Sequence, residues 1–374
     1  MTVTIREVTS NKQFRQFINF PYKLYKGNKY WAPPIRSDEK STLSRSKNPA
    51  FEYCNTKYWL AYKDGKIAGR IAGIHHKSHI EKWGKNQLRF GWIDFIDDPE
   101  VTSALLSAVE NWARELKMES IIGPLGFTDL DYSGMLVEGF EELGTLATIY
   151  NYPYYPEYLE LNGYRKDADW IEYQITIPVE KPAFIEKSAK RVKRQQKLRL
   201  VEAKKTKEIL HYAKGLFDVI NESYSKLYGV VPLSEKQIEK YTKQYIGYVH
   251  PDYIALIVDD SDNVVAFGVT MPSFTKALQK SQGRLFPFGI FHLLKAMKKN
   301  DLVDFYLIGI KSEYQGKGVG AMIMNKMADS FIKRGIKFAE SNPELESNDK
   351  IQTQWKFFDK RQHKRRRSYI KDLN

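Results

Sequence analysis

Apolar runs and helical periodicities alternate along the second half of the chain. The run 305–310 (Phe-Tyr-Leu-Ile-Gly-Ile) is short, apolar and rich in aromatic and β-branched residues, which predicts a buried strand. A glycine-rich segment, 315–320, follows it, and a helical pattern then continues to Arg334. Upstream, the apolar runs 253–258 and 264–271 flank an Asp-Ser-Asp-Asn turn, which predicts an antiparallel hairpin. We therefore expect a sheet with a strand–loop–helix unit at its centre.

Further elements are predicted around that unit. Residues 209–220 have the apolar spacing of a helix, and residues 336–339 read as a strand. A helix containing Trp355 and a final strand near 368–370 complete this half.

The first half repeats this order of elements. It contains a hairpin around the turn 63–66, a strand at 91–96, a helix at 101–116, a strand at 120–122, a helix at 154–161 and a closing strand at 170–177. An asparagine and an aromatic residue have the same seven-residue spacing in both halves: Asn151 and Tyr158, Asn348 and Trp355. The repeat and the length of 374 residues indicate a duplication. The predicted domains are residues 1–178 and 183–374, on either side of a proline-containing linker.

Composition narrows the class of protein. The hydrophobic content of 42% is enough for folded cores. A single cysteine, Cys54, excludes a disulfide framework, and the seven histidines show no zinc-ligand spacing, so no metal is expected. The chain starts with a polar segment, and no apolar stretch is long enough to span a bilayer. A cytoplasmic protein is therefore expected.

The net charge of +14 indicates an anionic partner: CoA, nucleic acid or an anionic membrane surface. Cationic residues concentrate in two clusters, 187–199 and 360–367, for which an ordinary solvated face is the alternative. No aromatic-rich RNA motif is present, so a specific nucleic acid is not expected. Peripheral contact with the inner face of an anionic membrane stays open.

The segment 315–320 (Gln-Gly-Lys-Gly-Val-Gly) carries the most specific chemistry. Glycines between a strand and a helix let successive backbone N–H groups bind a phosphate at the helix N-terminus. The dinucleotide pattern Gly-x-Gly-x-x-Gly and the P-loop pattern are both absent. Gln-x-x-Gly-x-Gly after a strand resembles the acyl-CoA pyrophosphate loop of the GNAT (GCN5-related N-acetyltransferase) superfamily. The resemblance implies a CoA diphosphate held by Gln315, Gly316, Lys317, Gly318, Val319 and Gly320.

Other segments extend the resemblance over the whole chain. They are Tyr-Trp-Ala-Pro-Pro at 30–34, Gly-Met-Leu-Val-Glu-Gly-Phe at 134–140, Asn-Tyr-Pro-Tyr-Tyr at 151–155, Gly-Arg-Leu-Phe-Pro-Phe-Gly at 283–289 and Leu-Glu-Ser-Asn at 345–348. Together they resemble a bacterial tandem GNAT family. The resemblance implies an α+β fold with a mixed α/β sheet in two tandem GNAT-like acyl-CoA N-acyltransferase domains. It also implies acetyl-CoA or a longer acyl-CoA as co-substrate; relatives of this kind include long-chain acyltransferases, with ceramide-forming ones among the candidates.

The superfamily reaction moves an acyl group from a CoA thioester to an amine. The tetrahedral oxyanion needs an N–H donor, and the resemblance places Ile308 to Ile310 beside the thioester. The leaving thiolate is commonly protonated by a tyrosine, but Trp355 stands at that position. A simple tyrosine-acid mechanism is therefore in doubt.

The attacking amine must be neutral, so a base is needed. Glu313, Glu340 and Glu346 are candidates, and Glu340 is preferred because it ends a predicted strand. Each of them has a solvated surface carboxylate or a helix cap as its alternative. Asn348 is either a ligand of the pantetheine amide or a helix N-cap.

The first half departs from the superfamily pattern where the second has its glycines. It has Asp97-Asp98-Pro99-Glu100 there, and these carboxylates would repel a diphosphate. We therefore expect a first domain without CoA, which covers the acceptor side of the second domain's site. A tyrosine from 150–155 is expected to reach that site, with Tyr154 as the candidate catalytic residue.

An insertion at 283–299 mixes apolar residues with arginine and lysine. It reads as a core helix, as an interfacial segment on anionic lipid, or as a wall for a long acyl chain. The leading hypothesis is an acyl-CoA-dependent N-acyltransferase acting on a small amine or a long-chain lipid amine. The alternatives are a non-catalytic acyl-CoA-binding module and, ranked lower, a basic RNA-binding protein.

Overall fold

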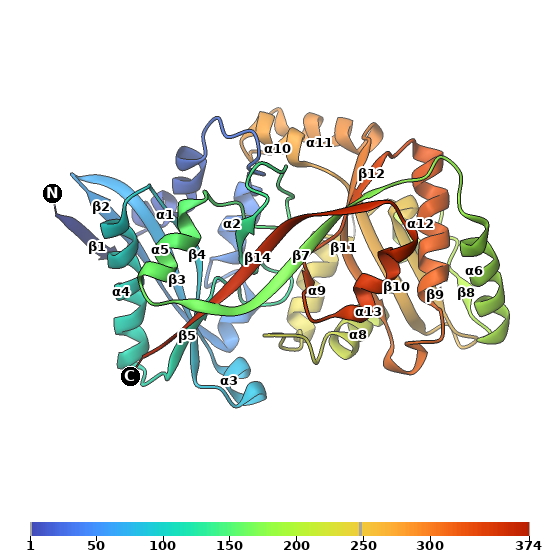
Figure 1. The fold of residues 1–374 in the computed structure, drawn as a ribbon, viewed down its shortest axis with the longest axis horizontal. Helices are drawn as coiled ribbons and strands as arrows, with labels where there is room; N and C mark the ends of the chain where they lie inside the picture. The colour runs from blue at the N-terminus through green and yellow to red at the C-terminus, as the bar shows by residue number, and fades with distance from the viewer. Residues whose placement is uncertain (1, 247–248, 374) are drawn as a thin grey trace. The chain divides into compact units, whose positions relative to one another are not determined.

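The computed structural model of the chain describes residues 2–246 and 249–373 (Figure 1). It divides into two compact units. Unit 1 comprises Met1–Ile171, Phe274–Leu294 and His363–Asn374, and unit 2 comprises Glu172–Ser273 and Lys295–Gln362. Each unit combines a mixed sheet with helices, which confirms the predicted α+β class.

Unit 1 is built on a sheet with the strand order β1-β2-β3-β4-β5-β14. Its pairs are antiparallel except for β4 and β5, which are parallel. The strands that lie wholly or partly in this unit are β1 (Val3–Glu7), β2 (Cys54–Lys63), β3 (Lys66–His76), β4 (Gln87–Phe95), β5 (Ser120–Gly123), β6 (Met135–Glu138), β7 (Arg165–Thr176) and β14 (Lys360–Asp372). The helices are α1 (Asn11–Leu24), α2 (Arg36–Thr42), the 3-10 helix η1 (Pro49–Glu52), α3 (Lys77–Trp83), α4 (Pro99–Glu115), α5 (Tyr154–Leu161), α10 (Thr275–Ser281) and part of α11 (Gly289–Lys298).

Successive residues of β2 face two separate cores in unit 1, as the two-residue period of a strand requires. Trp59 packs with Leu105 of α4, whereas Leu60 packs with Phe17 of α1. The helices α4 and α1 therefore cover opposite faces of this sheet.

Unit 2 contains a sheet with the strand order β7-β12-β11-β10-β9-β8. The pair β11–β12 is parallel and the other pairs are antiparallel. Besides parts of β7 and β14, the strands are β8 (Arg199–Leu200), β9 (Ile254–Val258), β10 (Val264–Pro272), β11 (Leu302–Ile310), β12 (Phe338–Glu340) and β13 (Glu344–Leu345). The α-helices are α6 (Ala183–Gln195), α7 (Thr206–Leu210), α8 (Ala213–Ser223), α9 (Glu235–Gln244), α12 (Gly320–Arg334) and α13 (Asp349–Gln352), and the 3-10 helices are η3 (Pro251–Tyr253), η4 (Ser312–Tyr314) and η5 (Thr353–Phe357).

Two predicted helices of unit 2 differ from the structure. The helix expected at 209–220 is split into α7 and α8, and the Tyr212 amide closes a turn onto the Ile209 carbonyl between them. Trp355 lies in the 3-10 helix η5 rather than in an α-helix. A few apolar positions do not distinguish the two helix types, because both bring residues three apart to one side.

The closing strand of each sheet comes from the opposite half of the chain. In unit 2, β7 pairs with β12, with Gln174 opposite Glu340. In unit 1, β14 pairs with β5, with Tyr369 opposite Gly123. The expectation that each half ends on its own closing strand is wrong, because a local pattern predicts a strand but not its partner. The domains 1–178 and 183–374 stay a prediction about the duplication, and the compact units divide the chain at other places.

The residues just before the insertion, and its first residue, are bonded within unit 1. Gln279 Nε2 donates to the carbonyls of Lys29 and Trp31, each at 2.9 Å. The backbone N–H of Arg36 donates to the Gly283 carbonyl at 3.0 Å. These bonds fix the base of the segment that follows.

The following segment, 286–294, presents large apolar side chains to solvent. The exposed fractions are 78% for Phe286, 72% for Phe288, 64% for Phe291 and 47% for Leu294. Of the three readings of the insertion, the core helix is therefore wrong.

Candidate active site

The segment 315–320, which joins β11 to α12 in unit 2, has the backbone of an anion-binding loop. Gly316 and Gly318 have φ values of 75° and 80°, which disfavour any residue with a Cβ. A Cβ on Gly318 would also lie 3.0 Å from Val192 Cγ2 of α6. Gln315 Nε2 donates to the Ile310 carbonyl at 3.1 Å, which ties the loop to the end of the strand.

The amides of this loop are available to a ligand. The first turn of α12 closes through Ala321 N to the Gly318 carbonyl at 3.0 Å and Met322 N to the Val319 carbonyl at 2.9 Å. Over the described ranges, no acceptor is found for the amides of Gly316, Gly318, Val319 and Gly320. Successive unpaired N–H groups at a helix N-terminus form a site for an anion. The ammonium of Lys317 lies 5.5 Å from the centre of the Tyr314 ring, at the start of the loop.

β11 separates from β12 as it approaches the loop. The parallel pairing covers Leu302–Asp304 opposite Phe338–Glu340, and β11 continues to Ile310 along β10. A register shift opposite Tyr306 marks a bulge. Asn342 Nδ2, from the loop after β12, donates to the Tyr306 carbonyl at 2.8 Å. The strand edge beyond the bulge is thus set apart from β12.

Ile308 lies on this separated edge, where the oxyanion donor was predicted. Its N–H donates to the Tyr224 hydroxyl at 3.3 Å, and the same hydroxyl donates to the Ile308 carbonyl at 2.9 Å. Tyr224, which ends α8, was not predicted as a site residue. No sequence pattern identifies it, because its contact with β11 depends on how α8 packs against the sheet.

Two carboxylates are buried side by side where β11 and β12 separate. Glu340, the preferred base, is 3% exposed, and Asp304 opposite it is 2% exposed. Paired residues of parallel strands project from the same face, so both side chains lie on one face of the sheet. Burial, and after it the Asp304 carboxylate, raise the pKa of the Tyr306 hydroxyl well above its ordinary value. Asp304 was not singled out from the sequence, because it lies in an apolar run.

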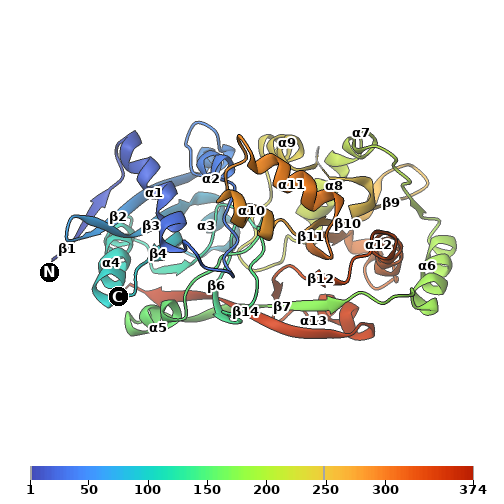
Figure 2. The same cartoon turned by 90° about the horizontal axis from the view of Figure 1, so that it is seen from above.

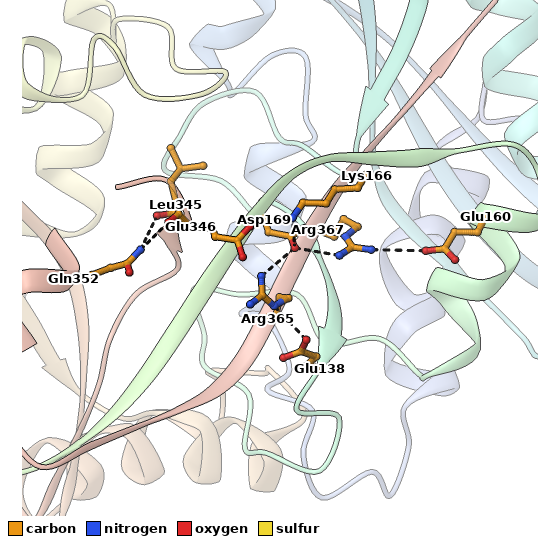
Figure 3. Close-up of polar contacts among 9 residues, drawn as sticks. All are labelled: Glu138, Glu160, Lys166, Asp169, Leu345, Glu346, Gln352, Arg365 and Arg367. Atoms are coloured by element: carbon orange, nitrogen blue, oxygen red, sulfur yellow. Dashed lines mark hydrogen bonds and ion pairs between the residues drawn. The ribbon is translucent and has the colours of Figure 1, made fainter. Parts of the chain in front are cut away.

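The other sequence candidates of unit 2 lie in exposed or capping positions. Glu346 is exposed, and its carbonyl accepts from Gln352 Nε2 at 3.0 Å (Figure 3). Asn348 stands at the N-cap position of α13, where its carbonyl accepts from the Ile351 amide at 3.2 Å. Glu313 is exposed in η4. Roles for Glu346 and Asn348 in the chemistry stay predictions.

Trp355, at the position of the usual tyrosine acid, is paired with a buried carboxylate. Its Nε1 donates to Glu344 Oε1 at 2.6 Å, and its ring centre lies 5.3 Å from that of Phe305. Burial raises the pKa of Glu344 to about 7. Glu344 Oε2 is also buried and has no hydrogen-bond partner in the described part of the chain. Sequence reasoning missed Glu344, since a glutamate between a proline and a leucine reads as a surface residue.

Replacing Glu344 with glutamine should make stability less sensitive to pH. The folded-state pKa of about 7 exceeds the ordinary value of 4.5. The contribution of this carboxyl group to the free energy of unfolding is therefore fully present below about pH 4.5 and is lost as the pH rises through 7. The amide avoids this loss, so Glu344→Gln should be the more stable protein at pH 8, by on the order of 3 kcal/mol. Urea unfolding midpoints at pH 4, 6 and 8 measure the difference, with Glu346→Gln as the exposed control. Parallel pH profiles for wild type and Glu344→Gln would show that the folded-state pKa is not raised.

In unit 1, the N-terminus of α4 already holds an anion of its own. The Asp98 carboxylate accepts from the amides of Glu100 at 3.0 Å and Val101 at 3.3 Å, and it pairs with Lys63. The sequence reasoning gave these carboxylates a repelling role. The structure adds that one of these carboxylates, that of Asp98, is itself hydrogen-bonded to the amides at the start of α4.

In unit 1, the end of β4, which corresponds to the end of β11, is also filled. Tyr155 OH accepts from the Phe95 amide at 2.8 Å, and its ring stacks on the Phe95 ring at 3.9 Å. Tyr154 OH donates to the Phe95 carbonyl at 2.9 Å, and burial raises the pKa of Tyr154 above its ordinary value. A catalytic role for Tyr154 stays a prediction.

The basic tail at 360–367 is not a solvated cationic face. Asp169 binds Arg367 Nε at 2.9 Å, Arg365 at 3.1 Å and Lys166 at 3.0 Å, all within unit 1 (Figure 3). Arg366 is 1% exposed and donates to the Ile149 carbonyl. Three of the tail arginines, Arg365, Arg366 and Arg367, are thus bonded within unit 1, which weakens the RNA-binding alternative.

Comparison with solved structures identifies the fold. A tandem GNAT protein from the clavulanic acid biosynthesis pathway matches with a TM-score of 0.58 and 10% identity, over 100% of this chain and 99% of that one. The chain has the fold of a tandem GNAT protein. The predicted fold of two tandem GNAT-like domains is thereby confirmed.

Two curated proteins are similar to the chain over nearly its whole length. Protein YghO of Escherichia coli (strain K12) is 29% identical, over 99% of this chain and 95% of its own length. The bacterial ceramide synthase of Caulobacter vibrioides (strain NA1000 / CB15N) is 25% identical, over 92% of this chain and 91% of its own length. No family model matches the sequence. The fold is thus that of a GNAT protein, and one of these two relatives is named as a ceramide synthase.

Two kinds of feature are absent from the described residues. None of the helices found there combines the length and apolar character that crossing a bilayer requires. Within the same ranges, no group of three or more His, Cys, Asp or Glu side chains is arranged to hold a metal ion.

Proposed function

We propose that the chain is an acyl-CoA-dependent N-acyltransferase, with the CoA diphosphate bound by residues 315–320 of unit 2. The observation that carries the proposal is the set of amides at Gly316, Gly318, Val319 and Gly320, for which no acceptor is found among the described residues. A diphosphate supplies such acceptors, and the dipole of α12 favours its negative charge. The co-substrate is acetyl-CoA or a longer acyl-CoA.

The separated edge of β11 would hold the pantetheine arm. Beyond Asp304, this edge is apart from β12, so its backbone groups can pair with the amides of the arm. The N–H of Ile308 is the candidate donor to the oxyanion. Its partner in the structure, the Tyr224 hydroxyl, would give way to the thioester oxygen.

The buried carboxylates Asp304 and Glu340 would receive the amine. Most amines reach an enzyme as ammonium ions, which a buried acidic pair attracts and can deprotonate. We assign the base to Glu340, because the end of β12 places it where the two strands separate. Trp355 is no proton source for the leaving thiolate, because its N–H is bound to Glu344.

The exposed segment 286–294 favours a long-chain lipid amine over a small soluble one. Its phenylalanines are accessible, and the surrounding stretch 276–300 contains six lysines and arginines but neither aspartate nor glutamate. An apolar face with a basic rim suits the surface of an anionic membrane. The similarity to a ceramide synthase agrees with a lipid acceptor. We therefore infer peripheral contact with such a membrane.

A non-catalytic acyl-CoA-binding module is the second candidate. The observation that favours it is Trp355. It stands where a proton-donating tyrosine is usual, and the N–H of its indole is bound to Glu344. This alternative predicts the same binding of acyl-CoA without transfer.

Titration with acetyl-CoA and palmitoyl-CoA, followed by thiol release in the presence of amines, tests the proposal. We expect one CoA equivalent per chain, because Asp98 and Tyr155 occupy the corresponding positions of unit 1. We also expect release of free CoA with at least one amine of a panel from short alkylamines to sphingoid bases. Two equivalents per chain would contradict the assignment to unit 2. Tight binding without release for any amine would favour the binding module.

A further inference from the structure

A basic hollow of about 390 Å³ opens on unit 2 at the C-terminal end of α6. Its charged lining consists of Lys190, Lys193, Arg194, Lys197, Arg199 and Asp260. Five cations and one carboxylate share a small volume, so their mutual repulsion favours a multiply charged anion.

Not all of these cations are neutralised within the protein. Lys190 pairs with Glu186 at 2.5 Å, and Arg199 pairs with Asp262. For Lys193, Arg194 and Lys197, no ion pair or side-chain hydrogen bond is found among the residues that the structure describes. Within the described part of the chain, three cations of the hollow are therefore without an ionic partner.

The end of α6 is shaped to bring Lys197 into this group. The Leu198 amide bonds to the Lys193 carbonyl at 3.0 Å, which closes the helix, and Lys197 adopts a φ of 51° between them. Glycine is the usual residue at this position of a helix end. Holding a lysine in the left-handed region costs conformational free energy. Such a cost is common at functional sites.

The helix that carries these cations also packs against the phosphate loop. Val192 precedes Lys193 in α6, and its Cγ2 would lie 3.0 Å from a Cβ on Gly318. α6 and α12 run side by side in both views (Figures 1 and 2). The hollow and the amides at 316–320 are thus neighbouring features of unit 2.

We infer that this hollow receives the 3′-phosphate of CoA. The inference rests on the proposed function and extends it to a second anion of the same molecule. CoA carries a diphosphate and, on the other side of its ribose, a phosphate monoester with a charge approaching −2. The loop amides suit the diphosphate, and unpaired lysine and arginine side chains suit the monoester.

The test compares CoA with 3′-dephospho-CoA, which lacks only this phosphate. Wild type should bind CoA at least about tenfold more tightly, the size expected for one charge-assisted contact. Lys193→Gln/Lys197→Gln should lose that preference and keep its affinity for 3′-dephospho-CoA. The matched control is Lys333→Gln/Lys337→Gln, which removes two exposed lysines at the other end of α12. Calorimetry measures each Kd, and thermal melting checks that every variant is folded.

Several outcomes separate the inference from the proposed function. Equal affinity of wild type for the two ligands would overturn the inference, as would an undiminished preference in the hollow variant. Reduced binding to phosphatidylglycerol vesicles with an unchanged preference would reassign the hollow to a membrane surface. Failure of wild type to bind either ligand would instead overturn the proposed function.

Discussion

Replacing Gly320 with aspartate should abolish CoA binding. The residue is the first of α12, and a Cβ there meets nothing closer than Ile310 Cδ1 at 3.9 Å, so the side chain fits. Its carboxylate would place a negative charge at the first residue of α12, beside the loop amides, and would repel the diphosphate. Losing two charge-assisted hydrogen bonds costs roughly 3–6 kcal/mol, which weakens binding by about a hundredfold or more. Calorimetric titration with CoA measures the effect.

The control for this experiment is Gly320→Ala, which adds the Cβ without the charge. It should bind CoA with nearly the affinity of wild type. Gly318→Asp should also fail to bind, with an added loss of stability because Gly318 has a φ of 80°. A folded Gly320→Asp protein with undiminished CoA affinity would refute the assignment of the loop.

Replacing Phe286, Phe288 and Phe291 with serine should weaken binding to anionic vesicles by about a hundredfold or more. Complete burial of a phenylalanine contributes up to about 3 kcal/mol, and partial insertion of three such rings still supplies several kcal/mol. Nearby lysines and arginines add about 1 kcal/mol each at the surface, so binding should also weaken with salt. Sedimentation with phosphatidylglycerol vesicles measures both effects.

A matched control removes three exposed apolar side chains elsewhere: Leu161→Ser/Val179→Ser/Phe357→Ser. This variant should bind vesicles as wild type does. If the phenylalanine variant instead loses a preference for palmitoyl-CoA over acetyl-CoA, with vesicle binding unchanged, the segment is a wall for the acyl chain. Unchanged behaviour in both assays would leave a small soluble amine as the better acceptor.

The strand–loop–helix unit was predictable because it is local. Apolar residues at 305–310, the glycines that follow and the helical period to Arg334 all lie within 30 residues, and the structure has β11, the loop and α12 there. Glu340 was predicted at a strand end for the same reason. Each of these predictions depends on neighbours in sequence and on no distant contact.

The parts that could not be predicted depend on contacts between distant residues. Nothing near Tyr369 shows that it pairs with Gly123. The contact of Tyr224 with Ile308 spans 84 residues, and the arginines of the tail read as solvated because their partner, Asp169, is 196 or more residues away. Glu344 was missed because burial, which sets its pKa, is a property of the folded protein.

The exchanged closing strands constrain how the chain can be made and divided. β5 of unit 1 receives its partner from Tyr369–Asp372, near the end of the residues described. During synthesis, unit 1 therefore cannot complete its sheet until nearly all of unit 2 has left the ribosome. A gene cut at the 178–182 linker would give two fragments, of which the first has an open β5 edge and the second carries a strand, β14, without its partner. Such halves would need each other to become folded, so coexpression rather than separate expression is the way to obtain them.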